Sequence, residues 1–93
     1  MRKSRVDGNQ KQIVRELRAM GYSVRHTHMV RDGFPDIVIG RAGYNLLVEI
    51  KMPGEGLTSD EKDFFDSWNG AVVIGTSAQE IHEAFVRMMK GNL

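Results

Sequence analysis

The sequence predicts an α/β domain with a mixed four-stranded sheet flanked by helices. Three short apolar runs, at 37–39, 46–48 and 71–75, lie between glycine, proline or turn residues and have the composition of buried strands. Longer segments with apolar residues at helical spacing stand before and after them. Because 93 residues can form one hydrophobic core but not two, we expect a single domain at 7–93 behind a flexible basic arm at 1–6.

The first helix is expected to begin at Asp7 and to run to about Met20, where Gly21 ends it. An acidic residue followed three positions later by Gln10 is a typical helix start, and glycine is common just past a helix end. The apolar stripe is expected to consist of Ile13, Val14, Leu17 and Met20. Gln10 is either a residue of a functional site or no more than a helix cap.

Four strands are expected after the first helix. The first is predicted over 22–30, at an edge of the sheet. The apolar runs 37–39 and 46–48 are separated by a short, turn-rich link at 40–45, which predicts an antiparallel hairpin. The short apolar run at 71–75 is expected to be a central strand.

Two capping boxes predict the remaining helices. Thr58 with Glu61, and Ser77 with Glu80, have the spacing of this motif. The helix after Thr58 is expected to end by Gly70, and its aromatic residues are Phe64, Phe65 and Trp68. The core stripe of the last helix is expected to be Ile81, Ala84, Phe85 and Met88. A small domain has little room to bury all three aromatic side chains, which favours a homodimer.

Three ionisable residues interrupt the apolar hairpin. Asp36 follows Pro35 at the start of one strand, and Glu49 and Lys51 end the next. Residues i and i+2 of a strand point to the same face, so Glu49 and Lys51 project together, and the hairpin brings Asp36 beside them. Buried charges are paired or bind metal, and two carboxylates suit a hard cation such as Mg²⁺. Taken alone, the pattern favours a salt bridge at a strand end over a cation site, and it is the surrounding residues that shift this balance.

The residues around this group resemble a nuclease family. Pro35-Asp36, twelve intervening residues and Glu49-Ile50-Lys51 are similar to the PD-(D/E)XK nuclease signature. From about residue 7 to about residue 83 the chain resembles the small stand-alone VRR-NUC domains of phages and prophages, through Asn9-Gln10, Gly33-Phe34-Pro35-Asp36-Ile37-Val38-Ile39-Gly40, Glu49-Ile50-Lys51 and Leu57-Thr58-x-x-Glu61.

The resemblance implies a restriction-endonuclease-like core (αβββαβα) and a metal-dependent deoxyribonuclease. Asp36, Glu49 and the backbone carbonyl of Ile50 would hold Mg²⁺ or Mn²⁺, and Lys51 would position the attacking water and offset charge on the phosphate. Members of the superfamily often add a glutamate from the first helix, where this chain offers Gln10. The implied substrate is branched DNA, such as a Holliday junction, cut by a homodimer to leave a 5′-phosphate.

Basic residues concentrate in the first third of the chain. Residues 1–31 hold eight Lys and Arg against two acidic residues, whereas residues 32–93 hold five against ten, and the net charge is +1. This asymmetry fits an enzyme that grips phosphate and holds a cation. The predicted DNA contacts are Arg2, Lys3, Arg5 and Lys11. For Arg15 and Arg18, a solvated helix face is the favoured interpretation.

Composition narrows the remaining possibilities. The chain has no cysteine, which excludes disulfides, thiolate nucleophiles and cysteine-based zinc sites. His26 and His28 share a strand face without a matching third ligand, so a polar edge or a phosphate contact is favoured over zinc. No apolar run approaches the length of a membrane span. We therefore expect a cytoplasmic protein with no membrane partner, encoded by a phage or prophage if the resemblance holds.

Two alternatives to a nuclease stay open. The first is a DNA-binding module of the same fold without activity, which the missing helix-one glutamate favours. The second is a structural or interaction protein in which Asp36, Glu49 and Lys51 form a salt bridge and nothing more. A requirement for divalent cations separates the nuclease from both.

Overall fold

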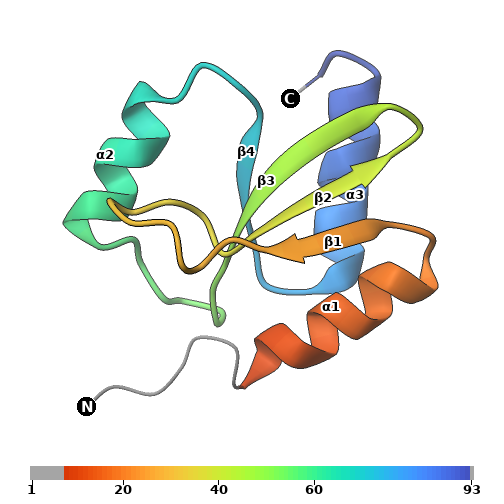
Figure 1. Ribbon diagram of the computed structural model, residues 1–93, viewed down its shortest axis with the longest axis horizontal. Coiled ribbons are helices and arrows are strands. Elements are labelled where there is room, and N and C mark those ends of the chain that lie inside the picture. The colour runs from red at the N-terminus through yellow and green to blue at the C-terminus, as the bar shows by residue number, and fades with distance from the viewer. Residues whose placement is uncertain (1–7, 93) are drawn as a thin grey trace.

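The computed structural model describes residues 8–92, and these residues have the element order that the sequence predicts. In chain order the elements are α1 (Asn9–Ala19), β1 (Ser23–His26), β2 (Ile37–Arg41), β3 (Tyr44–Ile50), α2 (Ser59–Ser67), β4 (Val72–Gly75) and α3 (Ala78–Met89) (Figure 1). The predicted α/β class is therefore confirmed. The predicted basic arm at 1–6 and the predicted first cap, Asp7, lie outside the described residues.

The strands form one mixed sheet in the order β1-β2-β3-β4. β1, β2 and β3 are antiparallel neighbours, and β4 runs parallel to β3. The mixed four-stranded sheet is as predicted, but the expectation of a central strand at 71–75 was wrong, because β4 is an edge strand. Since β2 already pairs with one side of β3, the chain that returns through α2 pairs with the other side.

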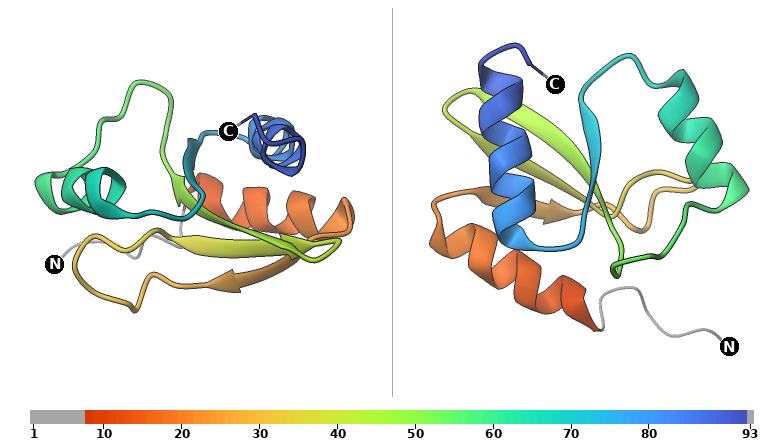
Figure 2. Two further views of the ribbon diagram at one scale, coloured as in Figure 1. Left: turned by 90° about the horizontal axis from the view of Figure 1, so that it is seen from above. Right: turned by 180° about the vertical axis from the view of Figure 1, so that it is seen from behind.

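The hydrophobic core lies between the sheet and two helices, α1 and α3, which cover the same face (Figure 2). Side chains alternate along β2 and β3, so Ile37 and Ile39 share a face with Leu46 and Val48. The helices complete the core with Ile13, Val14, Leu17, Ile81 and Phe85. This packing holds the ends of β2 and β3, where the predicted site residues lie.

α1 begins at a glycine in place of the predicted acidic cap, and Gly21 follows its end as predicted. Gly8 occupies the N-cap position with a φ of 72°, and no side chain caps the helix. The predicted apolar stripe is buried except for Met20, which is 36% exposed. Gly21 turns the chain with a φ of 97°, and the Tyr22 N–H donates to the Leu17 carbonyl over 3.1 Å. Met20 is therefore left at the C-cap in solvent, and Tyr22 is buried instead.

β1 is shorter than the strand predicted over residues 22–30, because a turn begins at Thr27. The Thr27 N–H donates to the Asp36 carbonyl over 2.8 Å, and its hydroxyl donates to the Pro35 carbonyl over 2.7 Å. The Val30 N–H in turn donates to the Thr27 carbonyl over 3.0 Å. These bonds close the loop between β1 and β2 and hold Asp36 beside the end of β1.

β2 and β3 form the predicted antiparallel hairpin. The strands are joined by a two-residue turn, Ala42-Gly43, in which both residues have positive φ, at 55° and 86°. Turns of this kind match the twist of the flanking strands. The strands extend beyond the predicted apolar runs because the polar residues at their ends, Arg41 and Tyr44, still pair.

α2 lies beyond the end of the sheet, beside the loop that joins β1 to β2 (Figure 1). Its capping box forms as predicted, with the Thr58 hydroxyl accepting from the Glu61 N–H and the Glu61 carboxylate accepting from the Thr58 N–H. From the loop, Phe34 contacts Phe64 and Trp68 edge-on, at ring-centre distances of 5.2 and 6.1 Å. These aromatic contacts attach α2 to the loop.

α3 begins with half of the predicted capping box. The Ser77 hydroxyl accepts from the Glu80 N–H over 3.1 Å, but the Glu80 carboxylate accepts from the Thr76 N–H over 2.6 Å instead of from Ser77. Three residues of the predicted core stripe are buried, and Met88 is half-buried against the core. The helix therefore packs on the sheet as its pattern predicts.

Two glycine variants test the contact between the loop and α2. Gly33 has a φ of 75°, and a Cβ there would overlap the backbone of Asp60, whereas nothing lies within 4 Å at Gly43, which has a φ of 86°. We expect Gly43→Ala to cost about 1 kcal/mol through backbone strain, and Gly33→Ala to cost roughly 2 kcal/mol more through overlap. Urea unfolding of the three proteins measures both costs. Equal costs would contradict the contact.

Candidate active site

Asp36 and Glu49 lie across from each other where β2 begins and β3 ends. Ile37 pairs with Val48 in the hairpin, so Asp36 and Glu49 occupy the next opposed position. Side chains at directly opposed positions have Cβ atoms roughly 4.5–5.5 Å apart. Both residues are buried, with exposed fractions of 4% and 1%. The hairpin thus brings the two predicted carboxylates together, as the sequence analysis expects.

The Ile50 peptide lies directly beside this pair. The Ile50 N–H donates to Asp36 Oδ2 over 2.8 Å in a buried hydrogen bond. The carbonyl of the next residue, Lys51, accepts a hydrogen bond from Nδ2 of the Asn9 side chain over 3.3 Å. The backbone at the end of β3, which is predicted to supply a metal-ligating carbonyl from Ile50, is therefore held from both sides.

Lys51 is buried among carboxylates, with an exposed fraction of 2%. Its Nζ lies 2.7 Å from Glu61 Oε1, 3.6 Å from Glu49 Oε2 and 3.7 Å from Glu55 Oε2. Burial would lower the pKa of Lys51, but the hydrogen bond and charge of Glu61, followed by the charges of Glu49 and Glu55, raise it. Lys51 is therefore a charged ammonium with a position set mainly by Glu61.

Glu61 contacts the predicted site through Lys51, although the sequence analysis gave it only as a helix cap and as part of the family pattern, without a role in the site. One of its oxygens, Oε1, accepts both from Lys51 Nζ over 2.7 Å and from the Thr58 N–H over 2.9 Å. Burial would raise the pKa of Glu61, but the bonds from Lys51 and Thr58 outweigh it and hold the pKa at about 2. The sequence signal that could have identified this contact is the capping box. Its glutamate lies in the first turn of α2, directly after the loop that follows Lys51.

Glu49 has the opposite electrostatic environment. Burial, then the charge of Asp36, and then a hydrogen bond with Glu61 raise its pKa from 4.5 to about 8, and the charge of Lys51 only partly opposes them. At neutral pH the Glu49 carboxyl is therefore mainly protonated and able to donate to Glu61. A positive charge placed between Glu49 and Asp36 would favour release of that proton.

The donor set at this position fits a hard divalent cation. Within residues 8–92, no group of three or more His, Cys, Asp and Glu side chains is arranged to hold a metal ion. The available donors are instead two carboxylates, from Asp36 and Glu49, and the neighbouring backbone carbonyl. Mg²⁺ commonly takes one or two protein carboxylates and fills its other positions with water and substrate phosphate. Burial and then the charge of Asp36 raise the pKa of Glu49 and disfavour its ionised form, and such a cation would favour that form.

Gln10 is buried in the first turn of α1 but contacts His26 rather than the carboxylates. Its Nε2 lies 3.2 Å from His26 Nδ1, and the N-cap position belongs to Gly8, so Gln10 is not the helix cap. The residue before it, Asn9, makes the contact with the Lys51 carbonyl. The sequence analysis quoted Asn9 within the family pattern but did not assign it a role in the site.

Of the predicted DNA contacts, only Lys11 belongs to the described part of the chain. Lys11 lies exposed on α1, whereas Arg2, Lys3 and Arg5 lie outside the described residues. Every helix within residues 8–92 is too short or too polar to cross a membrane. Comparison with protein-family models, curated proteins and solved structures gave no match.

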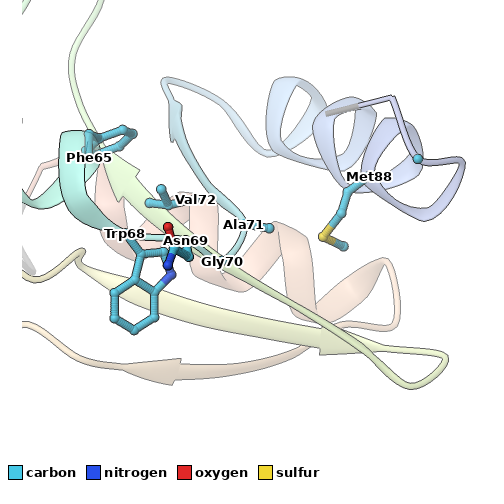
Figure 3. A pocket seen from close by; sticks show the side chains of 8 residues that line it. Phe65, Trp68, Asn69, Gly70, Ala71, Val72 and Met88 are labelled. Atoms are coloured by element: carbon cyan, nitrogen blue, oxygen red, sulfur yellow. The ribbon is translucent and has the colours of Figure 1, made fainter.

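A separate cavity of about 520 Å³ lies between the end of α2, the start of β4 and the end of α3. Figure 3 shows Trp68 and Asn69 on one side of it and Met88 on the other. None of the side chains that line it is ionisable, and none belongs to the carboxylate group. Groups able to transfer protons or hold a cation are therefore found at the strand ends and not in this cavity.

Glu49→Gln is expected to stabilise the metal-free protein at alkaline pH. The folded pKa of about 8 exceeds the ordinary 4.5, so folding takes up a proton between these values, and the free energy of unfolding falls as pH rises through them. Glutamine avoids this loss. Its advantage should grow with pH to roughly 1 kcal/mol or more, or about 4–8 °C in Tm. Thermal unfolding in EDTA from pH 5 to 9, with exposed Glu83→Gln as the control, measures it. Parallel curves for the two variants would refute the raised pKa.

Glu61→Gln is expected to show the opposite pH dependence. The folded pKa of about 2 lies below the ordinary 4.5, so the stabilisation by the Lys51 ion pair is present above pH 4.5 and is lost as pH falls toward 2. Glutamine can complete the capping box but cannot neutralise the ammonium. The variant should be roughly 1–3 kcal/mol less stable at pH 7, with a smaller difference at pH 3. Urea unfolding at pH 7 and at pH 3 measures the difference in the free energy of unfolding between the variant and the wild-type protein. A difference that is as large at pH 3 as at pH 7 would argue against the ion pair.

Proposed function

We propose that this chain is a DNA endonuclease that requires Mg²⁺ or Mn²⁺ and has a restriction-endonuclease-like core of the VRR-NUC type. The observation that carries the proposal is the buried pair Asp36 and Glu49 at opposed strand ends, with the Lys51 ammonium 3.6 Å from Glu49. An ordinary buried salt bridge sets one carboxylate against one cation, whereas Glu49 lies near both Asp36 and Glu61 here, and burial and the charge of Asp36 raise its pKa. Buried carboxyl groups that lie this close together are suited to a cation.

Each residue of the group has a distinct chemical task. Asp36, Glu49 and the Ile50 carbonyl would hold the ion, and Glu49 would give up its proton on binding. When bound, the ion would supply Lewis-acid activation of a phosphodiester and of water. The Lys51 ammonium, kept charged by Glu61, can orient a water molecule and offset the negative charge that develops on the phosphate during attack. The expected product carries a 5′-phosphate.

The substrate is proposed to be branched DNA such as a four-way junction, bound by a homodimer inside the cell that carries the phage or prophage. Arg2, Lys3, Arg5 and Lys11 would contact phosphates without reading sequence. The proposal of a second copy is supported by the aromatic surface after α2, where Trp68 is 43% exposed and stacks on Phe64 at 4.9 Å. Two copies would present two sites to a junction that has two-fold symmetry.

One observation favours an inactive DNA-binding module of the same fold as the second candidate. The first turn of α1 offers Gln10, which contacts His26, where a third carboxylate would strengthen cation binding. An amide oxygen is a weaker ligand for a hard cation than a carboxylate. The two candidates differ in one measurable property, since the module would bind DNA without cutting it.

A cleavage assay on linear, flap and four-way DNA, with Mg²⁺, Mn²⁺ or EDTA, tests the proposal. Wild-type protein should cut at least one substrate only with a divalent cation, and Asp36→Asn should lower the rate by about 100-fold or more. Asp66→Asn, on the exposed face of α2, is the matched control and should keep full activity. Full activity in EDTA would refute the cation site, and tight binding without any cleavage would favour the module.

A further inference from the structure

A groove of about 450 Å³ runs along α1, separate from the carboxylate group. Its lining residues are Lys11, Val14, Arg15, Arg18 and His26. The three cations stand at i, i+4 and i+7, so they form one stripe along the helix, and buried Val14 lies between them. The stripe covers roughly 10 Å of helix axis, which is long enough to contact more than one phosphate of a DNA strand.

The groove begins beside the candidate cation site. His26, at its end, contacts Gln10 at 3.2 Å, and the neighbouring Asn9 donates to the Lys51 carbonyl. The pKa of His26 is lowered by burial and then by the charges of His28 and Arg18, while the charge of Asp36 opposes them. The ring therefore lies within electrostatic reach of both Asp36 and the basic stripe. Because the Gln10 amide nitrogen can only donate, His26 Nδ1 is the acceptor and the neutral ring carries its proton at Nε2.

Within residues 8–92, the cations of this stripe form no ion pair with a carboxylate. The ion pairs found there involve Lys51 and Lys62, and neither Lys11 nor Arg15. The Arg18 guanidinium makes one bond, from Nη2 to the Val24 carbonyl over 3.0 Å, which fixes it at the groove. Exposed cations that make no ion pair within residues 8–92 can take phosphate oxygens.

The opposite flank of the carboxylate group has the opposite charge. Residues 55–66, which include α2, carry Glu55, Asp60, Glu61, Asp63 and Asp66 against Lys62 alone. A phosphate chain that left the cation site in that direction would meet like charge within about a Debye length. In the direction of α1 it would meet the basic stripe. The charge distribution therefore favours one path for a polyanion over the other.

We propose that the groove along α1 binds the sugar–phosphate backbone of the DNA strand that passes through the candidate cation site. Lys11 and Arg15 contact phosphates, Arg18 lies toward the C-terminal end of α1, and the His26 ring lies at the end beside the candidate cation site. This inference rests on the proposed nuclease function for the strand that it names. It adds Arg15, Arg18 and His26 to the DNA-binding surface, although the sequence favours a solvated face for the two arginines.

The test compares two double variants that each remove two positive charges. Lys11→Ala/Arg15→Ala alters the groove, and Arg87→Ala/Lys90→Ala alters two exposed cations at the C-terminal end of α3, in its last turn and at its C-cap. Arg18 is left in place because it also bonds to the Val24 carbonyl. Both pairs are made in wild-type protein and in Asp36→Asn protein, which should bind DNA without cutting it. Thermal unfolding confirms that each variant is folded.

Two quantities are measured for each protein. The first is the Kd for labelled duplex and four-way DNA at roughly 50 to 200 mM salt. The second is the rate of cleavage. The groove pair should lower the salt slope by about two, since each phosphate contact contributes ~0.9. It should weaken binding by roughly 10-fold or more and raise KM. The α3 pair should change the slope by much less. Equal effects of the two pairs, or no effect of the groove pair, would overturn the groove.

The same experiment separates the groove from the function on which it rests. Cleavage by wild-type protein, together with unchanged binding by the groove pair, would retain the nuclease and discard the groove. DNA binding that depends on Lys11 and Arg15, without cleavage in any divalent cation, would retain the groove and discard the nuclease. Wild-type protein that neither binds nor cuts DNA would overturn both.

Discussion

The buried carboxyl of Glu49 is the constraint to which the rest of the site responds. Burial and the charge of Asp36 both disfavour its ionised form and raise its pKa to about 8. Neighbouring groups reduce the cost, since the Ile50 N–H donates to Asp36 and Lys51 lies 3.6 Å from Glu49. Glu61 takes the closest position to Lys51, at 2.7 Å. A cation beside Glu49 would favour its ionised form, and local instability of this kind is common where function requires it.

The surrounding fold tolerates this cost because the carboxylates stand at the ends of well-packed strands. Val48, the residue before Glu49, is fully buried and pairs with Ile37 in the hairpin. α2 is attached less extensively, through Phe34 on one side and Glu61 on the other. The oxygen of Glu61 that caps α2 is also the one that holds the Lys51 ammonium, so a displacement of α2 would move the nearest partner of the lysine.

The features that could be predicted from the sequence are those that depend on residues close together along the chain. The hairpin, the α2 capping box and the meeting of Asp36 with Glu49 follow from spacing and strand alternation, and the structure has all three. The edge position of β4 could not be predicted, because an apolar run does not tell which side of β3 remains open. The contact of Glu61 with Lys51 was missed for the same reason, since it depends on how α2 packs beyond the sheet.

Charge distribution relates the cation site to the way in which a polyanion could approach it. Two carboxylates repel phosphate, so under the proposed function a bound cation must first invert the local sign. One ion cannot hold a nucleic-acid strand in register, and the basic stripe on α1 supplies charge on one flank only, while the acidic segment at 55–66 opposes binding on the other. This asymmetry gives the strand a single path across the domain. One domain would then engage one strand, which is why cutting both strands of a symmetric junction would require a second copy.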